Sequence, residues 1–481
     1  MKKILFATSE AVPFIKTGGL ADVTGSLPRY FDKKEYDVRV ILPKYVCMDE
    51  QWKGQLRFLC HFYVNLSWRK QYVGIFETKY EGITYYLVDN EFYFAGNMPY
   101  NNIYEDVEKF AYFSKAVLEA LPYLDFCPDV IHCHDWQTGL LPVFLRTIYG
   151  DEHYYAGIKT VFSIHNLKFQ GRWLLPAVMD ITGLPKQIFS ADKLEAYGEA
   201  NYLKGGIVYA DAVTTVSPTY AYEITTPEGG EGLDGLLYSC RNKLYGILNG
   251  LDYEEYNPKK DKYIKNHFDA TDFKVGKAKN KAELQRALGL PVNDKVFLLG
   301  MVSRMTSQKG FDLIAYIMDE MLQKEKIQLA IVGTGENQYQ DMLRYFAGKY
   351  PEKLSVTIGY SETLAHEIYA SCDGFLMPSL FEPCGLSQLM SLRYGTVPIV
   401  RETGGLKDTV EAYNEYTGEG TGFSFANYNA HEMLHTIRYA MSVYYGKKKD
   451  WEQLVEQGMK KDFSWEKSVL EYGKLYNKIT E

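Results

Sequence analysis

The sequence lacks the features that mark secreted, membrane-spanning and nucleic-acid-binding proteins. Its 7 cysteines are scattered over 481 residues without a C-x-x-C spacing, which favours reduced thiols in a reducing compartment. No stretch of about 18 apolar residues occurs, and the first apolar run meets Ser9 and Glu10 too soon to be the core of a signal peptide. The net charge of −8 argues against a partner held by a basic face. We therefore expect a cytoplasmic protein with no membrane or nucleic-acid partner.

Signatures of a bound metal or dinucleotide are also missing. No D-x-D sequence is present to hold a divalent ion on a nucleotide diphosphate. The glycine turns of the chain fit neither the G-x-G-x-x-G fingerprint nor the Walker pattern, which argues against an NAD-dependent dehydrogenase and against a P-loop enzyme. We expect no metal and no cofactor.

What the sequence does contain is a regular alternation of short β-rich runs with helical patterns, such as the helix predicted over 105–121. This alternation indicates parallel sheets covered on both faces. It pauses at the turn-rich segment 248–268 and then restarts. We predict an α/β protein with two Rossmann-like, doubly wound domains, 1–247 and 248–463, that face a deep cleft. The predicted strands are 3–8, 38–42, 129–133, 160–164 and 212–216 in the first domain, and 296–303, 327–333, 354–359, 374–379 and 396–400 in the second.

Two similar glycine turns lie near opposite ends of the chain, KTGGLAD from Lys16 and ETGGLKD from Glu402. Gly18 and Gly19 let the backbone approach a ligand, and the helix after them offers free N–H groups to an anion. Lys16 adds a positive charge, although a tight turn with a solvated lysine is the alternative. We interpret the two turns as loops at related places in the two domains, the second serving more to shape its surroundings.

The second half carries a stronger signal for an anionic ligand. Arg304 and Lys309 lie in one polar loop between a strand and a helix, where both could reach one diphosphate. Glu382 lies among aromatic, proline and glycine residues, where a carboxylate can accept hydrogen bonds from sugar hydroxyls. The turn from Gly385 to Ser387 opens a helix and could cap a phosphate. Solvated side chains at a surface loop and a helix start are the alternative.

In the first half, polar clusters end two apolar strands and should meet at one edge of the sheet. Zinc is an alternative interpretation, but the spacing of the histidines fits no standard zinc pattern. A catalytic thiolate at Cys133 or Cys384 is a further alternative, and neither cysteine has an identified cationic partner. The clustered residues are His132, His134, Asp135, His165 and Asn166.

Eight short segments of the sequence together resemble the bacterial glycogen synthase and plant starch synthase family (glycosyltransferase family 5). They occur in the family's order over nearly the whole chain. The resemblance implies transfer of glucose from ADP-glucose to the non-reducing end of an α-1,4-glucan such as glycogen, with retention of the anomeric configuration and without a metal. It also implies a GT-B fold in which a last helix, 464–481, returns to the first domain. The segments that carry it are KTGGLADVTGSLP, HCHDWQTGL, SIHNLKFQG, ILNGLDYEEYNP, SRMTSQKG, IGYSE, FEPCGLSQ and ETGGLKDTV.

The resemblance also implies roles for single residues around the donor and the sugar. At the position where the wider superfamily often has a second glutamate, this chain has Met390, so no second carboxylate is assigned there. For the donor, the implied groups are Lys16 with the Gly18–Gly19 loop, Arg304 and Lys309 on the diphosphate, the turn of Cys384, Gly385, Leu386 and Ser387 on the distal phosphate, and Tyr360 near the adenine. For the sugar they are Glu382 on its hydroxyls, His165, Asn166 and Asn249 on its other side, and Asp135 toward the acceptor.

Other functions remain open at this point. A retaining transferase with a small acceptor, such as a sucrose or trehalose phosphate synthase, is one alternative, and a catalytically silent glucan-binding protein is another. Retention could use a carboxylate nucleophile, for which Asp135 is the only candidate. It could instead use attack of the acceptor on the face that the diphosphate leaves. The oligomeric state is not predicted.

Overall fold

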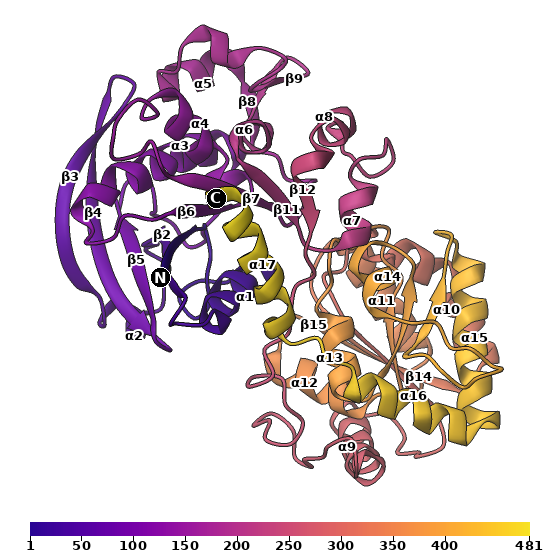
Figure 1. Cartoon of the computed structure of the whole chain (residues 1–481). Helices are drawn as coiled ribbons and strands as arrows, with labels where there is room; N and C mark the ends of the chain where they lie inside the picture. Colours follow the sequence, from indigo (N-terminus) through magenta and orange to yellow (C-terminus); the bar gives the residue numbers. More distant parts are fainter. The chain divides into compact units, whose positions relative to one another are not determined.

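The computed structural model describes residues 1–481 and divides the chain into two compact units. Unit 1 comprises Met1–Gly250 together with Trp465–Glu481, and unit 2 comprises Leu251–Ser464. Each unit is an α/β domain built around one large, mostly parallel sheet (Figure 1). None of the helices combines the length and the apolar character that a membrane span needs.

The sheet of unit 1 has nine strands in the order β12-β11-β7-β6-β1-β2-β5-β4-β3. Neighbours from β12 to β5 pair in parallel, whereas β4 pairs antiparallel with both β5 and β3. Helices cover both faces of the parallel part, so a strand such as β1 is a continuous apolar run. The strands are β1 (Lys2–Ala7), β2 (Tyr36–Pro43), β3 (Arg57–Leu66), β4 (Arg69–Tyr80), β5 (Ile83–Asp89), β6 (Val130–His134), β7 (Lys159–Ile164), β11 (Ala212–Thr215) and β12 (Leu244–Gly246), with β8 (Arg172–Leu174), β9 (Glu195–Ala196) and β10 (Glu199–Asn201) in a separate small sheet.

The helices of unit 1 connect these strands, and several begin at a side-chain cap. Asn102, for example, accepts a hydrogen bond from the amide of Glu105 and starts α3. The helices are α1 (Gly19–Ser26), η1 (Leu27–Tyr30), α2 (Glu50–Lys53), α3 (Ile103–Ala120), η2 (Leu121–Tyr123), η3 (Trp136–Thr138), α4 (Leu140–Thr147), α5 (Leu175–Thr182), η4 (Lys186–Phe189), α6 (Tyr202–Tyr209), α7 (Pro218–Glu223), α8 (Asp234–Ser239), η5 (Arg241–Lys243) and α17 (Trp465–Thr480).

Unit 2 is a six-stranded sheet, parallel throughout, in the order β15-β14-β13-β16-β17-β18. The strands are β13 (Phe297–Val302), β14 (Ile327–Gly333), β15 (Leu354–Ile358), β16 (Gly374–Met377), β17 (Val397–Arg401) and β18 (Phe423–Phe425). The helices are α9 (Phe273–Ala287), η6 (Ser307–Lys309), α10 (Phe311–Lys324), α11 (Asn337–Lys349), α12 (Glu362–Ser371), α13 (Ser387–Arg393), α14 (Gly404–Thr409), α15 (Ala430–Gly446) and α16 (Lys448–Lys460).

The two sheets share one topology. In unit 2, β13, β14 and β15 run outward on one side and β16, β17 and β18 on the other, which is the Rossmann order 3-2-1-4-5-6. In unit 1, β1, β2 and β5 take one side, and β6, β7, β11 and β12 take the other. The order reverses between β1 and β6 and between β13 and β16. Ligands of such sheets bind beyond the carboxyl ends of the strands at this switch point, so the loops after these four strands are where a site should form.

The last helix of the chain belongs to the core of unit 1, where it is drawn in yellow (Figure 1). Trp465, Val469, Tyr472 and Tyr476 are buried against residues of β1, β2 and η1. The hydroxyl of Tyr476 lies 2.7 Å from Nδ1 of His132. A single apolar face of α17, repeated at helical spacing, therefore joins the end of the chain to the sheet that its beginning forms.

One interpretation from the sequence is wrong. The two glycine turns do not lie at related places, because Gly18 and Gly19 follow β1, the first strand of unit 1, whereas Gly404 and Gly405 follow β17, the fifth strand of unit 2. The counterpart of the Lys16 loop in unit 2 is the loop after β13. Similar turn residues satisfy similar local geometry, and the place of a loop in a sheet depends on strand order, which local sequence does not encode.

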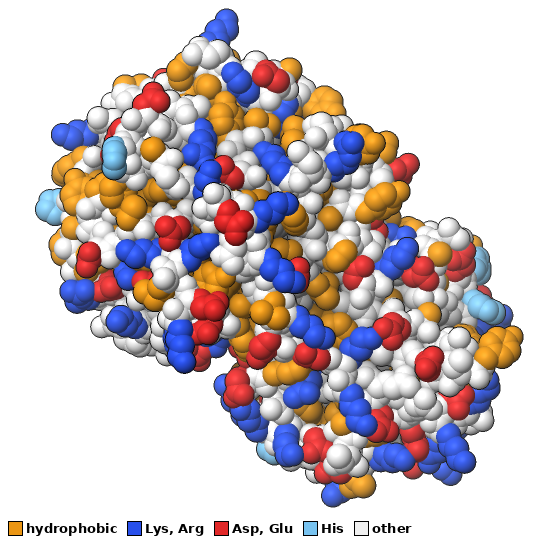
Figure 2. Space-filling view, in the orientation of Figure 1, with side chains coloured by type: hydrophobic (Ala, Val, Ile, Leu, Met, Phe, Trp, Pro, Cys, Tyr) orange, Lys and Arg blue, Asp and Glu red, His pale blue; other side chains and the backbone are white.

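On the face that Figure 2 shows, positively and negatively charged side chains are mixed. Lysine and arginine side chains are interspersed there with aspartate and glutamate. This distribution agrees with the small negative net charge of the chain.

Candidate active site

At the switch point of unit 2, a cation and a carboxylate from two loops pair directly. Nζ of Lys309, after β13, lies 2.5 Å from Oε2 of Glu382, after β16, and the hydroxyl of Ser379 donates to the same oxygen at 3.0 Å. Both side chains are largely buried. Each charge is balanced by the other, which offsets part of the cost of removing both from water. Two residues 73 positions apart, both predicted from the sequence, thus meet in one site.

The loops after β13 and β16 are held together by backbone contacts that require glycine. Gly310 has φ +80°, and a Cβ there would lie 2.3 Å from the carbonyl oxygen of Pro378. The amide of Leu380 donates to the carbonyl of Gln308 at 2.8 Å. Any side chain at Gly310 would separate the two loops, and Lys309 would lose its position beside Glu382.

The second glycine turn, Gly404–Gly405, packs against the loop that carries Glu382. The amide of Gly405 donates to the carbonyl of Glu382 at 3.1 Å, and a Cβ on Gly404 would lie only 2.0 Å from that carbonyl oxygen. Glu402, which leads this turn, accepts a hydrogen bond from Ser424 on β18 at 2.8 Å. The turn therefore positions a functional loop, and its glutamate is tied to the sheet.

The remaining predicted donor groups of unit 2 lie at the same edge of the sheet. The exposed Arg304 follows β13, and its guanidinium forms no ion pair. The turn of Cys384, which is buried, and of Gly385 and Leu386, which are half-buried, leads into α13, whose first residue, Ser387, is half-buried too. Tyr360 follows the edge strand β15 and is 77% exposed. The predicted residues thus come from the ends of three strands, β13, β15 and β16.

One residue of this turn was not found from the sequence. Gln388 is fully buried, and its amide nitrogen donates to the carbonyls of Cys384 and Gly385 at 3.1 and 2.9 Å. Gly385 has φ +70°, and a Cβ there would meet the Gln388 side chain at 2.5 Å. Gln388 therefore fixes the turn expected to hold the distal phosphate. A glutamine one residue into a helix carries no signal that would distinguish it from a surface residue.

In unit 1, Asp135 ends β6 beside the switch point in an unusual backbone conformation. Its φ is +56° and its ψ is −179°, a conformation that costs free energy in a non-glycine residue and is typical of functional sites. Oδ1 accepts a hydrogen bond from the amide of His165 at 2.7 Å. Burial raises the pKa of the Asp135 carboxyl to about 7, and the charge of Glu10 adds to the rise, while the amides of His165 and Asn166 oppose it. Asp135 thus titrates near neutral pH.

The histidines of unit 1 form a buried chain. Nδ1 of His134 lies 3.0 Å from Nε2 of His165, and Nε2 of His132 lies 2.6 Å from the hydroxyl of Ser163. Burial lowers the pKa of His165 to about 4 and those of His132 and His134 well below their usual range. All three rings are therefore neutral at pH 7. His165 and Asn166 reach the carboxyl edge after β7 as predicted, whereas His132 lies within the core.

Metal and thiolate chemistry find no support in the geometry. No group of three or more His, Cys, Asp or Glu side chains is placed to hold a metal ion. Burial raises the pKa of the Cys133 thiol beyond the range in which a thiolate forms at neutral pH. Cys384 is buried as well. That the reaction proceeds without a metal stays a prediction.

Lys16 and its glycine loop lead from the end of β1 into α1. Nζ of Lys16 lies 2.8 Å from Oδ1 of Asp22 in the first turn of that helix. Gly18 and Gly19 are exposed, and Gly18, the N-cap, offers no side chain to the first amides of α1. These amides can therefore receive an acceptor group from a ligand. Asn249, after β12, is buried, and its side-chain oxygen has no hydrogen-bond partner.

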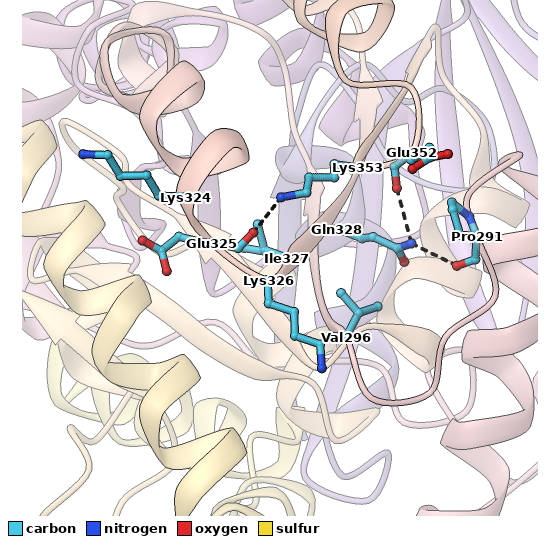
Figure 3. A pocket seen from close by; sticks show the side chains of 9 residues that line it. All are labelled: Pro291, Val296, Lys324, Glu325, Lys326, Ile327, Gln328, Glu352 and Lys353. Carbon is cyan, nitrogen blue, oxygen red and sulfur yellow. Dashed lines mark hydrogen bonds between the residues drawn. The ribbon is translucent and has the colours of Figure 1, made fainter.

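A cavity of unit 2 lies at the opposite edge of its sheet. This cavity, of about 360 Å³, is lined by residues that precede or begin β13, β14 and β15, among them Val296, Gln328 and Lys353 (Figure 3). The amide of Gln328 donates to the carbonyls of Pro291 and Glu352, and the ammonium of Lys353 donates to backbone carbonyls. The side chains of Gln328 and Lys353 are bonded to the backbone of the protein, so they hold this edge together.

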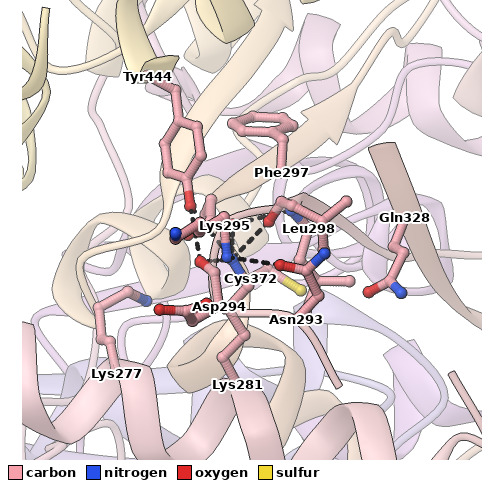
Figure 4. Close-up of polar contacts among 12 residues, drawn as sticks. Lys277, Lys281, Asn293, Asp294, Lys295, Phe297, Leu298, Gln328, Cys372 and Tyr444 are labelled. Carbon is pink, nitrogen blue, oxygen red and sulfur yellow. Dashed lines mark hydrogen bonds and ion pairs between the residues drawn. The ribbon is translucent and has the colours of Figure 1, made fainter. Parts of the chain in front are cut away.

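Buried lysines also hold this edge together. Nζ of Lys281 contacts Oδ2 of Asp373 at 2.6 Å and the carbonyl of Asp294 at 3.2 Å, with Tyr444 nearby (Figure 4). Burial lowers the pKa of Lys277 to about 7. These contacts join α9 to the amino ends of the strands, away from the switch point.

Comparison with known families agrees with this architecture. Residues 3–239 match the family described as starch synthase catalytic domain, and residues 280–460 match the family described as glycosyl transferases group 1. With two Rossmann-type sheets, these matches define a glycosyltransferase with the GT-B fold.

Relatives with assigned functions match over the full length. A glycogen synthase from Lachnospira eligens is 60% identical over 100% of both chains, and one from Bacillus cereus is 50% identical over 99% of this chain and 100% of its own. The structure of the catalytic domain of starch synthase IV from Arabidopsis thaliana, bound to ADP and acarbose, has a TM-score of 0.91 and 32% identity and covers 100% of this chain and 99% of its own. The chain belongs to the glycogen synthase and starch synthase family. A sucrose-phosphate synthase from Thermosynechococcus elongatus, 15% identical with a TM-score of 0.63, covers 100% of this chain and 99% of its own and shares the fold alone.

Proposed function

We propose that the chain is a retaining glucosyltransferase that adds glucose from ADP-glucose to the non-reducing end of an α-1,4-glucan. The observation that carries the proposal is the buried Lys309–Glu382 pair at the switch point of unit 2. A lysine beside a carboxylate suits a ligand that presents phosphate and sugar hydroxyls side by side. The full-length similarity to glycogen synthases supports the choice of glucan as acceptor.

The leaving diphosphate is stabilised by fixed cations in this proposal. Departure of ADP builds negative charge on the phosphate oxygens, and preorganised charges stabilise it without a cost of reorganisation. Arg304 is unpaired and free to turn toward the phosphates, Lys309 is held in place by Glu382, and Lys16 supplies a third positive charge. The hydroxyl of Ser387 and the amides after Gly385 take the distal phosphate.

One carboxylate and several uncharged side chains hold the transferred glucose. Glu382 accepts from its hydroxyls, His165 and Asn249 contact its other side, and Tyr360 lies near the adenine. Because His165 is neutral at pH 7, its imidazole can both donate and accept. The unpartnered oxygen of Asn249 is a further acceptor inside the protein.

Retention follows from attack of the acceptor hydroxyl on the face that the diphosphate leaves, with the diphosphate oxygen taking the hydroxyl proton. Asp135 orients the acceptor in this scheme. A covalent route through Asp135 would require its carboxylate to be fully ionised and exposed to the anomeric carbon. Its burial and its pKa of about 7 favour the orienting role.

The experiment is release of ADP from ADP-glucose with glycogen as acceptor, beside the same assay with UDP-glucose and with a small sugar acceptor. We expect ADP release that depends on glycogen, with elongated chains as product, and a rate that a chelator leaves unchanged. Faster turnover of UDP-glucose would contradict the donor, and preference for a small sugar would contradict the acceptor. A rate abolished by chelator and restored by magnesium would contradict the role given to the cations.

A further inference from the structure

A buried carboxylate at the switch point of unit 1 has no role in the scheme above. Glu10 lies three residues after β1 and is only 3% exposed. Its backbone carbonyl accepts hydrogen bonds from the hydroxyls of Thr8 at 2.9 Å and Thr24 at 2.5 Å. Thr24 belongs to α1, so Glu10 is fixed to the helix that the Gly18–Gly19 loop begins.

The side chain of Glu10 connects two segments of the site. Oε1 accepts from the hydroxyl of Thr17 at 2.7 Å and from the phenol of Tyr100 at 2.5 Å. Oε2 accepts from the backbone amide of Thr17, the residue directly after Lys16. Three donors converge on one carboxylate, and all three are neutral.

No cation balances the charge of Glu10. Its partners are hydroxyl, phenol and amide groups, and none is a lysine or an arginine. A buried carboxylate without a cation costs free energy and acts on neighbouring groups through a medium that screens weakly. Burial is the largest cause of the raised pKa values of Asp135, Tyr45 and Tyr100, and the charge of Glu10 adds to each rise.

We propose that Glu10 is a positioning residue that holds the Lys16 loop through Thr17 and places a buried negative charge at the switch point at which Asp135 lies. The first part follows from three hydrogen bonds, and the second from two carboxylates at one switch point with no cation bonded to either. The proposal rests on the roles given above to Lys16 and Asp135.

The surroundings of both carboxylates support this pairing. The ionisable groups that act on Asp135 or lie against it are Glu10 after β1, His134 on β6, His165 after β7 and Tyr220 on α7. Those that act on Glu10 are Tyr45 after β2 and Tyr100 before α3. Both histidines are neutral and both carboxylates are buried, so the charge of Glu10 adds to burial in opposing the ionisation of Asp135.

The test compares the full-length enzyme with Glu10→Gln and Thr17→Val. Loss of the Glu10 charge should move the inflection near neutral pH in kcat/KM to lower pH, since removal of a like charge favours the ionised form of a carboxyl group. Thr17→Val keeps the charge and removes one donor, so it should raise KM for ADP-glucose about tenfold while the inflection stays in place. KM for glycogen should change little in Thr17→Val.

A second readout does not depend on activity. Thermal midpoints measured from pH 5 to pH 8 should show the loss of stability on ionising Asp135 at lower pH in Glu10→Gln than in the wild type. If wild-type protein releases no ADP, the proposed function fails while this readout still tests the pairing. Should Glu10→Gln not fold, Glu10→Asp, which keeps the charge, should fold and retain the inflection.

Controls come from another phenol–carboxylate hydrogen bond of unit 1, whose carboxylate also pairs with Arg69. The phenol of Tyr93 donates to Glu108 at 2.8 Å, away from the switch point. Tyr93→Phe and Glu108→Gln should leave the inflection unchanged. The proposal is overturned if Glu10→Gln folds with an unshifted inflection, or if Thr17→Val has wild-type KM for ADP-glucose.

Discussion

The two switch points of this protein have one topology and opposite electrostatics. In unit 2, the cation Lys309 and the carboxylate Glu382 form a largely buried ion pair at 2.5 Å. In unit 1, the corresponding carboxylate, Asp135, is bonded to backbone amides and its pKa rises to about 7. Lys16 pairs with Asp22 on its own helix. The same fold thus holds an ion pair where an anionic donor is proposed and a carboxyl group that titrates near neutral pH where an uncharged glucan is proposed.

Two histidines, one in each unit, also differ in their electrostatics. In unit 1, burial lowers the pKa of His165 to about 4. In unit 2, burial also acts to lower the pKa of His366, but the Asp261 carboxylate at 2.7 Å, with Glu362, raises it to about 9. A buried histidine therefore becomes neutral or charged according to whether a carboxylate shares its site.

The largest effect is expected from breaking the pair in unit 2. Lys309→Ala removes the cation proposed to bind the phosphates and leaves Glu382 buried with the Ser379 hydroxyl but without a cation. Loss of a charge-assisted hydrogen bond costs about 1.5–3 kcal/mol, so kcat/KM for ADP-glucose should fall at least about tenfold to a hundredfold. Steady-state assays should show near wild-type values for Lys279→Ala, an exposed lysine of α9. Equal losses in both variants would contradict the role of Lys309.

Glu382→Gln keeps the size of the side chain and removes its charge. We expect a fall in kcat of about a hundredfold with a much smaller change in the dissociation constant of ADP, because the carboxylate is proposed to bind sugar and not phosphate. Calorimetry with ADP and steady-state kinetics separate the two quantities. If ADP binding weakens as much as turnover slows, Glu382 acts on the phosphates.

Asp135→Asn tests the comparison at the switch point of unit 1. The pKa of Asp135 is raised from 3.8 to about 7, so the folded protein binds a proton that the unfolded chain has lost between these values. Stability of the wild type should therefore decline relative to Asp135→Asn as pH rises from about 4 to about 7, and the difference should stay constant above that. Thermal midpoints across this range measure it. A difference that grows instead toward low pH would mean that Asp135 is ionised throughout.

The smallest effect is expected at His366. Its pKa of about 9 exceeds the ordinary value of 6.5, so its ion pair with Asp261 stabilises the fold fully below about pH 6.5 and is lost as pH rises through about 9. Asp261→Asn should remove this dependence. Thermal midpoints of the variant and the wild type should converge between pH 7 and pH 10. Parallel curves would show that His366 is neutral in both.

Much of the fold could be predicted because parallel strands that are buried on both faces are apolar runs. β1, β6, β7, β13 and β14 agree with their predicted ranges within a residue or so. The antiparallel strands β3 and β4 were not predicted. Along β3, exposed and buried side chains alternate only from His61 onward, and the pairing of β3 with β4 shifts between Phe58 and Cys60. A short alternation interrupted by a bulge is a weak signal.

The residues of the candidate site also divide into those that the sequence predicts and those that it does not. Residues in glycine-bounded loops, such as Lys309 and Glu382, were identified because polar side chains after apolar strands stand out. Glu10 and Gln388 were missed, since only their burial and their hydrogen bonds distinguish them from surface residues.

The amino-acid sequence by itself determined the α/β class, the strand ends that carry the candidate site residues, and the family, because these depend on local composition and spacing. Tertiary structure alone decided which loops are counterparts, that Lys309 is paired with Glu382, and that Asp135 titrates near neutral pH. Ion pairing and burial depend on groups far apart in the chain. A pKa is a property of such surroundings, and no local stretch of sequence contains them.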